Sequence, residues 1–314
     1  MIYRLTFLLS FSLLLTNTNF AQTSGQLVAR ADSLYRAKDF QASGETYDLA
    51  FATAEGAPGA LYNAACSWAL AGATDKALNY VQRSLAAGWT NDEWMMKDPD
   101  LRSVQDHPRF IEMLAPLVAE RERREATYNK PLKARLDKIG MKDQMLRQLI
   151  GEVEAKFGRD SEEMDYYWSI MRQQDSLNEI EVVKIIDEYG WVGTSEVGGQ
   201  ANRALWLVIQ HAPQDIQEKY VPLLRESVKG GESKGSHLAL TEDRILMRQG
   251  KKQLYGSQVR RDNETGNYYL YPVENPHTLN ERRAELGMSP IEEYIARWKI
   301  KWDADAMAKQ EVKK

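Results

Sequence analysis

The sequence predicts a mainly α-helical protein, in which a short array of helix pairs precedes an α+β domain with a small antiparallel sheet. Three observations favour this fold class. Small and apolar residues recur every 34 residues in the first third of the chain. Apolar residues recur at helical spacing through most of the remainder. Turn residues also separate short β-favouring runs between residues 245 and 271.

Composition excludes one broad class of partner. The 314 residues are 43% hydrophobic, enough for ordinary cores in two domains. Lys plus Arg (41) nearly balances Asp plus Glu (45), which gives a net charge of −4. Because such a chain has no broad positive field, we expect no nucleic-acid partner.

The first 21 residues have the pattern of a cleavable signal peptide. Arg4 precedes an apolar run over 5–16, and residues 19–21 before Gln22 resemble a signal-peptidase site. An uncleaved anchor is the alternative, but the run is shorter than the roughly 20 residues that span a bilayer. No Cys lies near the cleavage site, so we expect no lipoprotein. We therefore expect a periplasmic or secreted protein without a membrane span after cleavage.

Cys66 is the single cysteine, so no intramolecular disulfide can form. Its neighbours are small residues and a tryptophan, which favours a buried structural thiol over a nucleophile. Export without disulfides is compatible with a bacterial periplasm.

Residues 24–119 are predicted to form helical repeats with a terminal cap. The 34-residue spacing relates Ala31 to Ala65, Leu34 to Trp68 and also Ser43 to Ala77, Tyr47 to Val81 and Ala50 to Ser84. Each unit is interpreted as two antiparallel helices that cross at small residues. A third copy does not continue in register, and residues 88–117 are interpreted as a shorter terminal helix pair.

This segment resembles tetratricopeptide repeat proteins over about 60 residues. It differs from the family pattern at Ala31 and Ala65, where glycine is commonest. The resemblance implies a concave surface for an extended peptide or a partner protein. The alternative is a structural appendage without a ligand. Since two repeats and a cap are fewer than the roughly three usually needed, we expect support from the following domain or a partner.

A charged segment over 120–135 is predicted to be a solvated helical linker, with Pro131 at the boundary. The second domain is assigned to residues 136–306, followed by a polar tail over 307–314. Its first helix is predicted from Leu136 to Val153 with an interruption near Gly140, and the next from Tyr166 to Tyr189.

Polar side chains on these two helices are candidate ligand-binding residues. Asp143 and Arg147 are four residues apart, which allows an ion pair, and Gln144 lies between them. Asp175 and Asn178 lie three residues apart on the second helix. The spacing allows either convergence of all five or two separate surface pairs.

The glycine-containing segment 190–199 is predicted to be a loop with a helix cap, and anion binding at its backbone is the alternative. The following segment, 204–209, is apolar on every face, which indicates a buried helix. It ends with Gln210 and His211, and Pro213 stops it. His211 has two interpretations, a C-terminal cap and a general base.

Asp243 and Arg244 are predicted to open a β-hairpin over 245–255 that turns at Gln249-Gly250. A second hairpin is predicted over 258–271. The chain then returns to helix, including one from Pro290 to about Ala306.

The polar residues of the second domain resemble, as a set, a bacterial family called domain of unknown function 6624. The resemblance covers about residues 136–297 and differs at Val192 and Ser257, where proline and threonine are expected. It implies no particular activity. Its motifs in this chain are Asp143-Gln144 with Arg147, Asp175 with Asn178, residues 189–191, residues 210–212, residues 240–244, residues 253–258, and Arg282-Arg283 through Gly287.

Two function hypotheses follow. The first is an exported interaction protein, whose repeats bind an unknown protein or peptide and whose second domain is a ligand-binding or structural domain. The alternative is a hydrolase-like enzyme with His211 as general base, Asp175 or Asp243 orienting it, and Arg244 steadying an anionic group. The candidate ligand-binding residues are Asp143, Gln144, Arg147, Asn178, Gln210, Gln253, Tyr255 and Gln258.

No metal or cofactor is expected, because the four histidines show no ligand spacing. His211 and His237 could still meet in space with Asp243.

Overall fold

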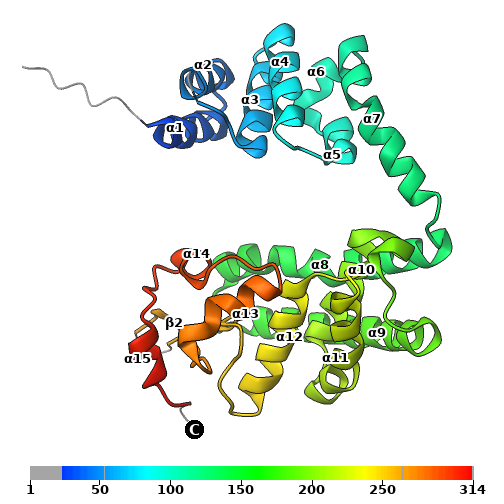
Figure 1. Ribbon diagram of the computed structural model, residues 1–314, viewed down its shortest axis with the longest axis vertical. Coiled ribbons are helices and arrows are strands. Elements are labelled where there is room, and N and C mark those ends of the chain that lie inside the picture. The colour runs from blue at the N-terminus through cyan, green and yellow to red at the C-terminus, as the bar shows by residue number, and fades with distance from the viewer. Residues whose placement is uncertain (1–22, 53, 263–264, 313–314) are drawn as a thin grey trace, which may run out of the picture. The chain divides into compact units, whose positions relative to one another are not determined.

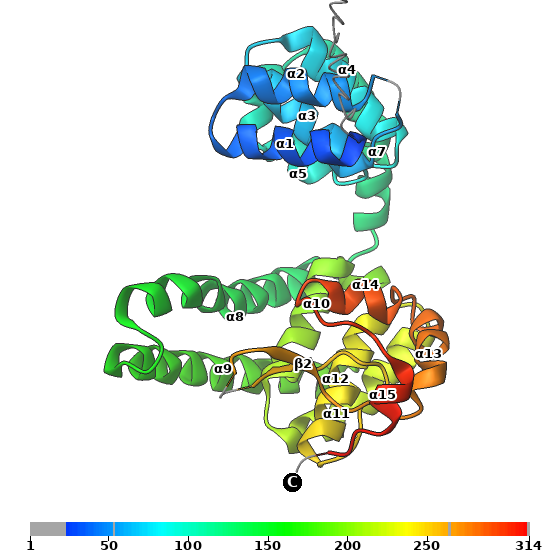
Figure 2. The ribbon, with the colours of Figure 1, turned by 90° about the vertical axis from the view of Figure 1, so that its left-hand side faces the viewer.

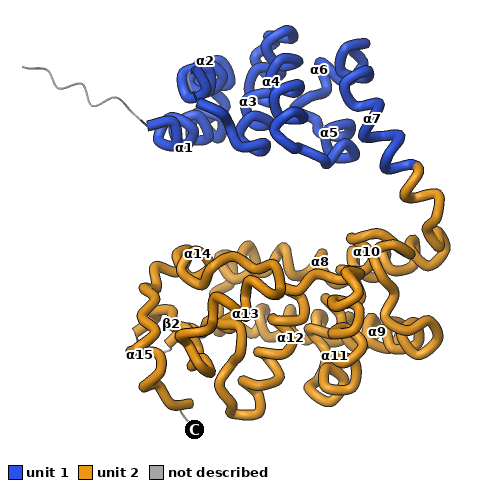
Figure 3. Tube along the Cα trace, viewed as in Figure 1, with its two compact units in different colours: residues 1–122 blue, residues 123–314 orange. Residues whose placement is uncertain are grey.

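A computed structural model describes residues 23–52, 54–262 and 265–312, so the expected signal peptide lies outside the described residues. The chain divides into two compact units, Met1–Glu122 and Arg123–Lys314 (Figure 3). The described part is mainly helical with one two-stranded antiparallel sheet, which confirms the predicted fold class (Figure 1). None of its helices is long and apolar enough to cross a membrane.

The first unit begins with two helix pairs, α1 (Ser24–Arg36) with α2 (Phe40–Ala50) and α3 (Pro58–Leu70) with α4 (Thr74–Ala86). Small residues lie at the crossings, as predicted: Ala31 and Ala65 are fully buried. Ser43 Oγ lies 3.0 Å from Ser67 Oγ and donates to the Ala31 carbonyl at 2.9 Å. The first contact joins the two pairs and the second lies within the first pair, and together they satisfy the buried Ser43 hydroxyl.

The first unit ends with three short helices and one long one. The short helices are α5 (Asp92–Lys97), the 3₁₀ helix η1 (Pro99–Leu101) and α6 (Arg102–Gln105), and the long helix α7 (Pro108–Glu125) follows them. The helix predicted over 120–135 is therefore not continuous. Asn129 caps a new helix by accepting from the Leu132 N–H at 3.2 Å, and Pro131 follows in its first turn.

The second unit begins with a long helical hairpin, α8 (Lys130–Phe157) and α9 (Glu162–Tyr189), whose helices lie side by side (Figure 2). The predicted interruption at Gly140 is wrong, because α8 is continuous there. A Cβ at Gly140 would lie 2.9 Å from Ala204 Cβ. Glycine at this position thus permits close approach to the next helix rather than ending its own.

Helix α10 (Thr194–His211) packs against α8 and α9, followed by α11 (Gln214–Lys229) and α12 (Gly235–Arg248). The prediction that residues 204–209 are buried is confirmed for every one of them. The α10 N-terminus is occupied from within the chain, since Glu232 accepts from the Ser195 N–H at 2.8 Å. This contact takes the place of the external anion considered for the glycine-containing segment.

The hairpin predicted over 245–255 is wrong, because residues 245–248 form the last turn of α12. Gly250 ends α12 in the left-handed backbone conformation, with φ 69°. The Lys251 N–H donates to the Leu246 carbonyl at 2.9 Å. Asp243 and Arg244 therefore lie on a helix. The short apolar run 245–247 resembles a strand. However, Ile245 lies seven residues after Leu238, and both pack in one buried cluster, as helical spacing predicts.

The second predicted hairpin is present. Strand β1 (Val259–Arg261) pairs antiparallel with β2 (Tyr268–Leu270), and Val259 faces Leu270. The chain ends with η2 (Pro276–Thr278), α13 (Leu279–Glu285), α14 (Ile291–Ala296) and α15 (Ala304–Ala308). The single helix predicted from Pro290 to Ala306 is wrong, because the chain leaves helical geometry at Lys299, which has φ 60°.

Candidate functional site

The last turn of α10 places His211 against a buried carboxylate of α8. His211 Nδ1 lies 3.0 Å from Asp143 Oδ1. The Asp143 side chain is 1% exposed, whereas that of His211 is 21% exposed. One edge of the imidazole is therefore fixed inside the domain, while the ring keeps access to solvent.

Two further side chains of α8 hold the same carboxylate. Gln144 Nε2 donates to Asp143 Oδ2 at 2.7 Å, and Arg147 Nη1 lies 3.4 Å from Asp143 Oδ1. Arg147 Nη1 also donates to the Asp143 carbonyl at 2.7 Å. Asp143 is thus surrounded by donors, as a buried charge requires.

The guanidinium of Arg147 connects this group to α9. Its Nη2 donates to both oxygens of Asp175, at 2.9 and 2.8 Å. Since Lys142 also meets Glu181 across the same helices, α8 and α9 run antiparallel and Asn178 lies near the level of Asp143. Asn178 is 1% exposed, and its Nδ2 has no hydrogen-bond partner within the described residues.

These contacts control the charge state of Asp143. Burial by itself would raise the pKa of this carboxyl. The hydrogen bond and charge of His211, together with Gln144 and Arg147, outweigh burial and hold the pKa below its ordinary value. Asp143 is therefore a carboxylate at neutral pH. We name the group of Asp143, Gln144, Arg147, Asp175 and His211 the His211 centre.

Asp243 has a different environment. It is fully buried and accepts backbone N–H groups from Leu254 at 2.7 Å, Tyr255 at 3.0 Å and Ser257 at 2.9 Å. Burial raises its pKa, opposed by these hydrogen bonds. Its carboxylate thus holds the segment after α12 in place.

The same segment is held by Gln253 and Arg283. The Gln253 side chain donates to the carbonyls of Gln258 at 3.1 Å and Tyr271 at 2.7 Å. Arg283, 1% exposed, donates to the Tyr255 carbonyl at 2.6 Å. The Gln258 amide in turn donates to the Leu240 carbonyl at 3.2 Å. These motif residues are joined to backbone groups of their own domain.

Gln210 and Arg244 join α10 to α12. Arg244 Nη1 donates to the Gln210 carbonyl at 2.7 Å, and the Gln210 side-chain amide lies 2.9 Å from the Thr241 hydroxyl. Burial lowers the pKa of the Arg244 guanidinium. The Gln210 carbonyl accepts a hydrogen bond from one of its buried N–H groups. Neither residue is hydrogen-bonded to the His211 centre through its side chain.

The twelve candidate residues thus lie in two regions. Five form the His211 centre, and Asn178 lies near them on α9. The other six lie on or beside α12 and the segment that follows it: Gln210, Asp243, Arg244, Gln253, Tyr255 and Gln258. The residue that orients His211 is Asp143, where Asp175 or Asp243 had been predicted. His237 does not join His211 and Asp243 either, because its ring stacks on Trp206 at 3.9 Å.

A separate hollow of about 420 Å³ lies in the first unit. Its lining comes from the first helix of each pair and from the α5–η1 segment. We name it the repeat hollow. It is lined by Asp32, Tyr35, Arg36, Tyr62, Asn63, Cys66, Trp94, Asp98 and Asp100.

Three carboxylates of the repeat hollow are held by neutral tyrosine hydroxyls. Tyr47 donates to Asp32, Tyr35 to Asp100 and Tyr62 to Asp98. A tyrosine hydroxyl positions a carboxylate but does not neutralise it. With one arginine among the lining residues, the hollow has a formal charge of −2, from three carboxylates and one guanidinium.

The residues of the repeat hollow were not predicted individually. The 34-residue spacing contains the signal, because it relates Asp32 to Cys66 and Cys66 to Asp100. All three positions line the hollow. Burial raises the pKa of the Cys66 thiol, in agreement with a structural thiol.

In the described part of the chain, two sets of side chains have ligand atoms close enough to share a cation: Asp143, Asp175 and His211, and Cys66, Asp98 and Asp100. Arg147 already bridges the first two carboxylates. Tyrosine hydroxyls hold the other two, and the thiol is protonated. We assign neither set to a metal.

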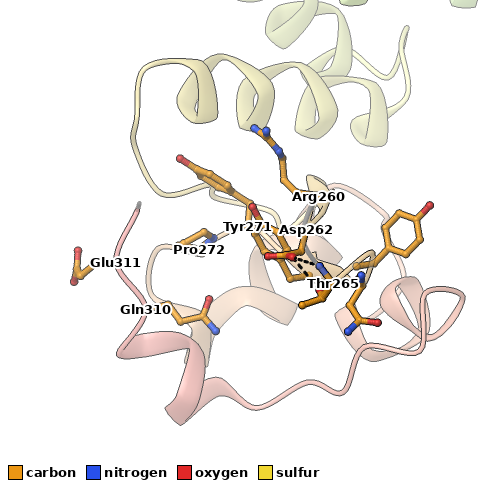
Figure 4. Close-up of a pocket in the computed structure, with 10 residues that line it drawn as sticks. Arg260, Asp262, Thr265, Tyr271, Pro272, Gln310 and Glu311 are labelled. Atoms are coloured by element: carbon orange, nitrogen blue, oxygen red, sulfur yellow. Dashed lines mark hydrogen bonds between the residues drawn. The ribbon is translucent and has the colours of Figure 1, made fainter. Parts of the chain in front are cut away.

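A further hollow of about 610 Å³ lies beside β1 and β2 (Figure 4). Its lining includes Arg260, Tyr268, Tyr269, Tyr271 and Gln310. None of the site residues predicted from the sequence contributes to it.

Comparison with known proteins identifies a family. Searches of curated proteins and of solved structures find no similar protein. The profile of a family of unknown function, DUF6624, matches residues 131–306, which is more than half of the 314 residues. The matched region contains the whole His211 centre and the residues that hold the segment after α12. The chain therefore belongs to the DUF6624 family.

Proposed function

We propose that this protein is an exported interaction protein, whose tetratricopeptide-like repeats bind an extended segment of a partner protein through a lysine or arginine side chain. The observation that carries the proposal is the repeat hollow, with its three carboxylates and its aromatic walls. The DUF6624 domain is then a second ligand-binding or structural domain of the same protein.

Charge determines the kind of side chain that the hollow would accept. Asp32, Asp98 and Asp100 attract a cation, and Arg36 is the one cation among the lining residues. Because tyrosines hold these carboxylates in fixed positions, a bound ammonium or guanidinium would meet preorganised acceptors.

Aromatic side chains support the same ligand chemistry. Trp94 is 51% exposed although it lines the hollow, and Tyr62 is stacked on Trp89 with ring centroids 4.3 Å apart. An exposed indole face beside carboxylates favours a cation through cation–π attraction. The aliphatic stem of lysine or arginine would also cover the exposed ring.

Peptide binding tests the proposal. Fluorescence anisotropy would compare labelled nonapeptides of random sequence that carry a central lysine, arginine, glutamine or glutamate. We expect binding of the lysine and arginine sets and loss of affinity in Asp100→Asn by about 1 kcal/mol or more, as for one charged hydrogen bond. Glu45→Gln, an exposed change on α2 outside the hollow, is the matched control. Equal binding of all four peptide sets would contradict the proposal.

Export has its own test. The proposal rests on the pattern of residues 1–21. N-terminal sequencing of the protein from the periplasmic fraction of a bacterial host should begin at Gln22. Recovery of the protein in the membrane fraction with Met1 retained would mean an uncleaved anchor.

The alternative enzyme hypothesis placed His211 in one site with Asp175 or Asp243 and with Arg244. Asp243, Arg244 and Gln258 are instead joined to backbone groups around α12. The arrangement with Asp243 and Arg244 in catalytic roles is therefore not proposed. The His211 centre is considered separately below.

A further inference from the structure

We propose that His211 is a general base in the DUF6624 domain, and that it activates water for the hydrolysis of a neutral carboxylic ester, with Asp143 as its positioning residue. This activity is independent of partner binding by the repeats.

The first support is the fixed orientation of the imidazole. Asp143 Oδ1 lies 3.0 Å from His211 Nδ1, and a carboxylate there requires the proton on Nδ1. The lone pair of neutral His211 then lies on Nε2. Within the described residues no hydrogen bond reaches Nε2, so this atom remains able to accept a proton.

The second support is the burial of the positioning carboxylate. Asp143 is 1% exposed and is held by Gln144 and Arg147 as well as by His211. Buried negative charge next to the ring stabilises the imidazolium that forms when Nε2 takes a proton. Solvent reaches the ring itself, at 21% exposure, but not the carboxylate behind it.

The charge of the centre indicates the class of substrate. Asp143 and Asp175 contribute two negative charges, and Arg147 contributes one positive charge. Both carboxylates already engage this guanidinium, so no cation remains in the centre to hold a phosphate group. A phosphate ester would be repelled, whereas a neutral acyl ester would not.

The reaction that this arrangement would support is balanced without a cofactor. The water oxygen forms a bond to the carbonyl carbon while Nε2 takes one water proton. The resulting tetrahedral anion expels the alcohol oxygen, which receives that proton from the imidazolium. Ester and water thus give acid and alcohol, and His211 returns to its neutral form.

Asn178 adds an unused donor to this region. Asn178 lies near the level of Asp143 in the α8–α9 hairpin, and its buried Nδ2 has no partner within the described residues. A buried N–H of this kind favours an acceptor from water or a ligand.

The test uses the full mature chain and p-nitrophenyl acetate as a neutral ester, with release of p-nitrophenolate followed at 405 nm. General bases typically contribute a factor of 10² to 10⁴. We therefore expect His211→Gln to reduce kcat by roughly 100-fold or more. Asp143→Asn should reduce kcat with little change in KM, because it disturbs orientation and not the ester contact.

The matched control is His277→Gln, which changes a histidine with a 62% exposed side chain in the same domain and should leave the rate unchanged. Circular dichroism would verify that each variant is folded. Equal rates for the wild type and His211→Gln would overturn the proposal. An acetyl group found on His211 by mass spectrometry would also overturn it, since it would identify a nucleophile. Faster hydrolysis of p-nitrophenyl phosphate than of the acetate would refute the substrate class.

Discussion

Acid should destabilise the second unit through one buried histidine, His237. Its side chain stacks on Trp206 at 3.9 Å, and its Nδ1 has no hydrogen-bond partner within the described residues. Burial, followed by the charges of Lys234 and Arg203, lowers its pKa from 6.5 to about 4. The folded protein therefore keeps His237 neutral at pH values where the unfolded chain protonates it.

The sign and size of the effect follow from linkage. Between pH 6.5 and about pH 4 the unfolded state binds more protons, so the free energy of unfolding falls as pH falls. One pKa unit corresponds to about 1.36 kcal/mol. From pH 7.5 to pH 4.5 the wild type should lose about 2 to 3 kcal/mol through His237.

The variant His237→Phe keeps an aromatic ring on Trp206 but cannot bind a proton. Urea unfolding would be measured at pH 7.5, 6 and 4.5, with hydrogen exchange of peptides from α10 and α12 as the readout. A readout local to these helices is needed because a two-unit protein need not unfold in one step. The stability difference between variant and wild type should move by about 2 to 3 kcal/mol in favour of the variant on acidification. Carboxyl titrations common to both proteins cancel in this difference. A difference that does not change with pH would refute the reasoning.

Three substitutions test the packing of the second unit. Asp243→Ala should cost about 3 kcal/mol or more in urea unfolding, because three backbone N–H groups lose their buried acceptor, and a loss under 1 kcal/mol would contradict this account. Gly140→Ala should cost about 1 to 3 kcal/mol, because its Cβ would lie 2.9 Å from Ala204 Cβ. On the same helix Gly151→Ala has no atom within 4 Å and should stabilise by about 0.5 to 1 kcal/mol through helix propensity. Equal effects of the two glycine substitutions would argue against a close α8–α10 contact.

Much of the fold follows from local patterns. The 34-residue spacing gave small residues at the crossings of α1 to α4, and those residues are buried. The apolar segment 204–209 is buried as its composition predicted. These features depend on residues near one another in sequence, which periodicity reports directly.

The errors arose where tertiary contacts determine local structure. Gly140 was expected to interrupt a helix because glycine has low helix propensity. Its lack of a side chain instead allows α8 to pack closely against Ala204 of α10. Gly250 was expected to form the turn of a hairpin, where glycine often has a positive φ. It has a positive φ, but it ends helix α12 instead. In both cases the role of glycine depends on what packs around it.

The sequence predicted most residues of the candidate site but not how they are arranged. Asp143, Arg147, Asp175 and His211 come together from three helices whose packing no local pattern specifies. Asp243 was predicted as an alternative to Asp175 for orienting His211, but its partners are backbone N–H groups that follow it by 11 to 14 residues. Side chains that hold a loop and side chains that act on a ligand look alike in one sequence.

The most direct test of partner binding is hydrogen exchange of the mature protein with and without the tightest-binding lysine or arginine peptide. We predict slower exchange in residues 32–36, 62–66 and 94–100, which surround the repeat hollow. Exchange in the DUF6624 domain should remain unchanged. Protection confined to residues 131–306, with none around the hollow, would contradict binding by the repeats.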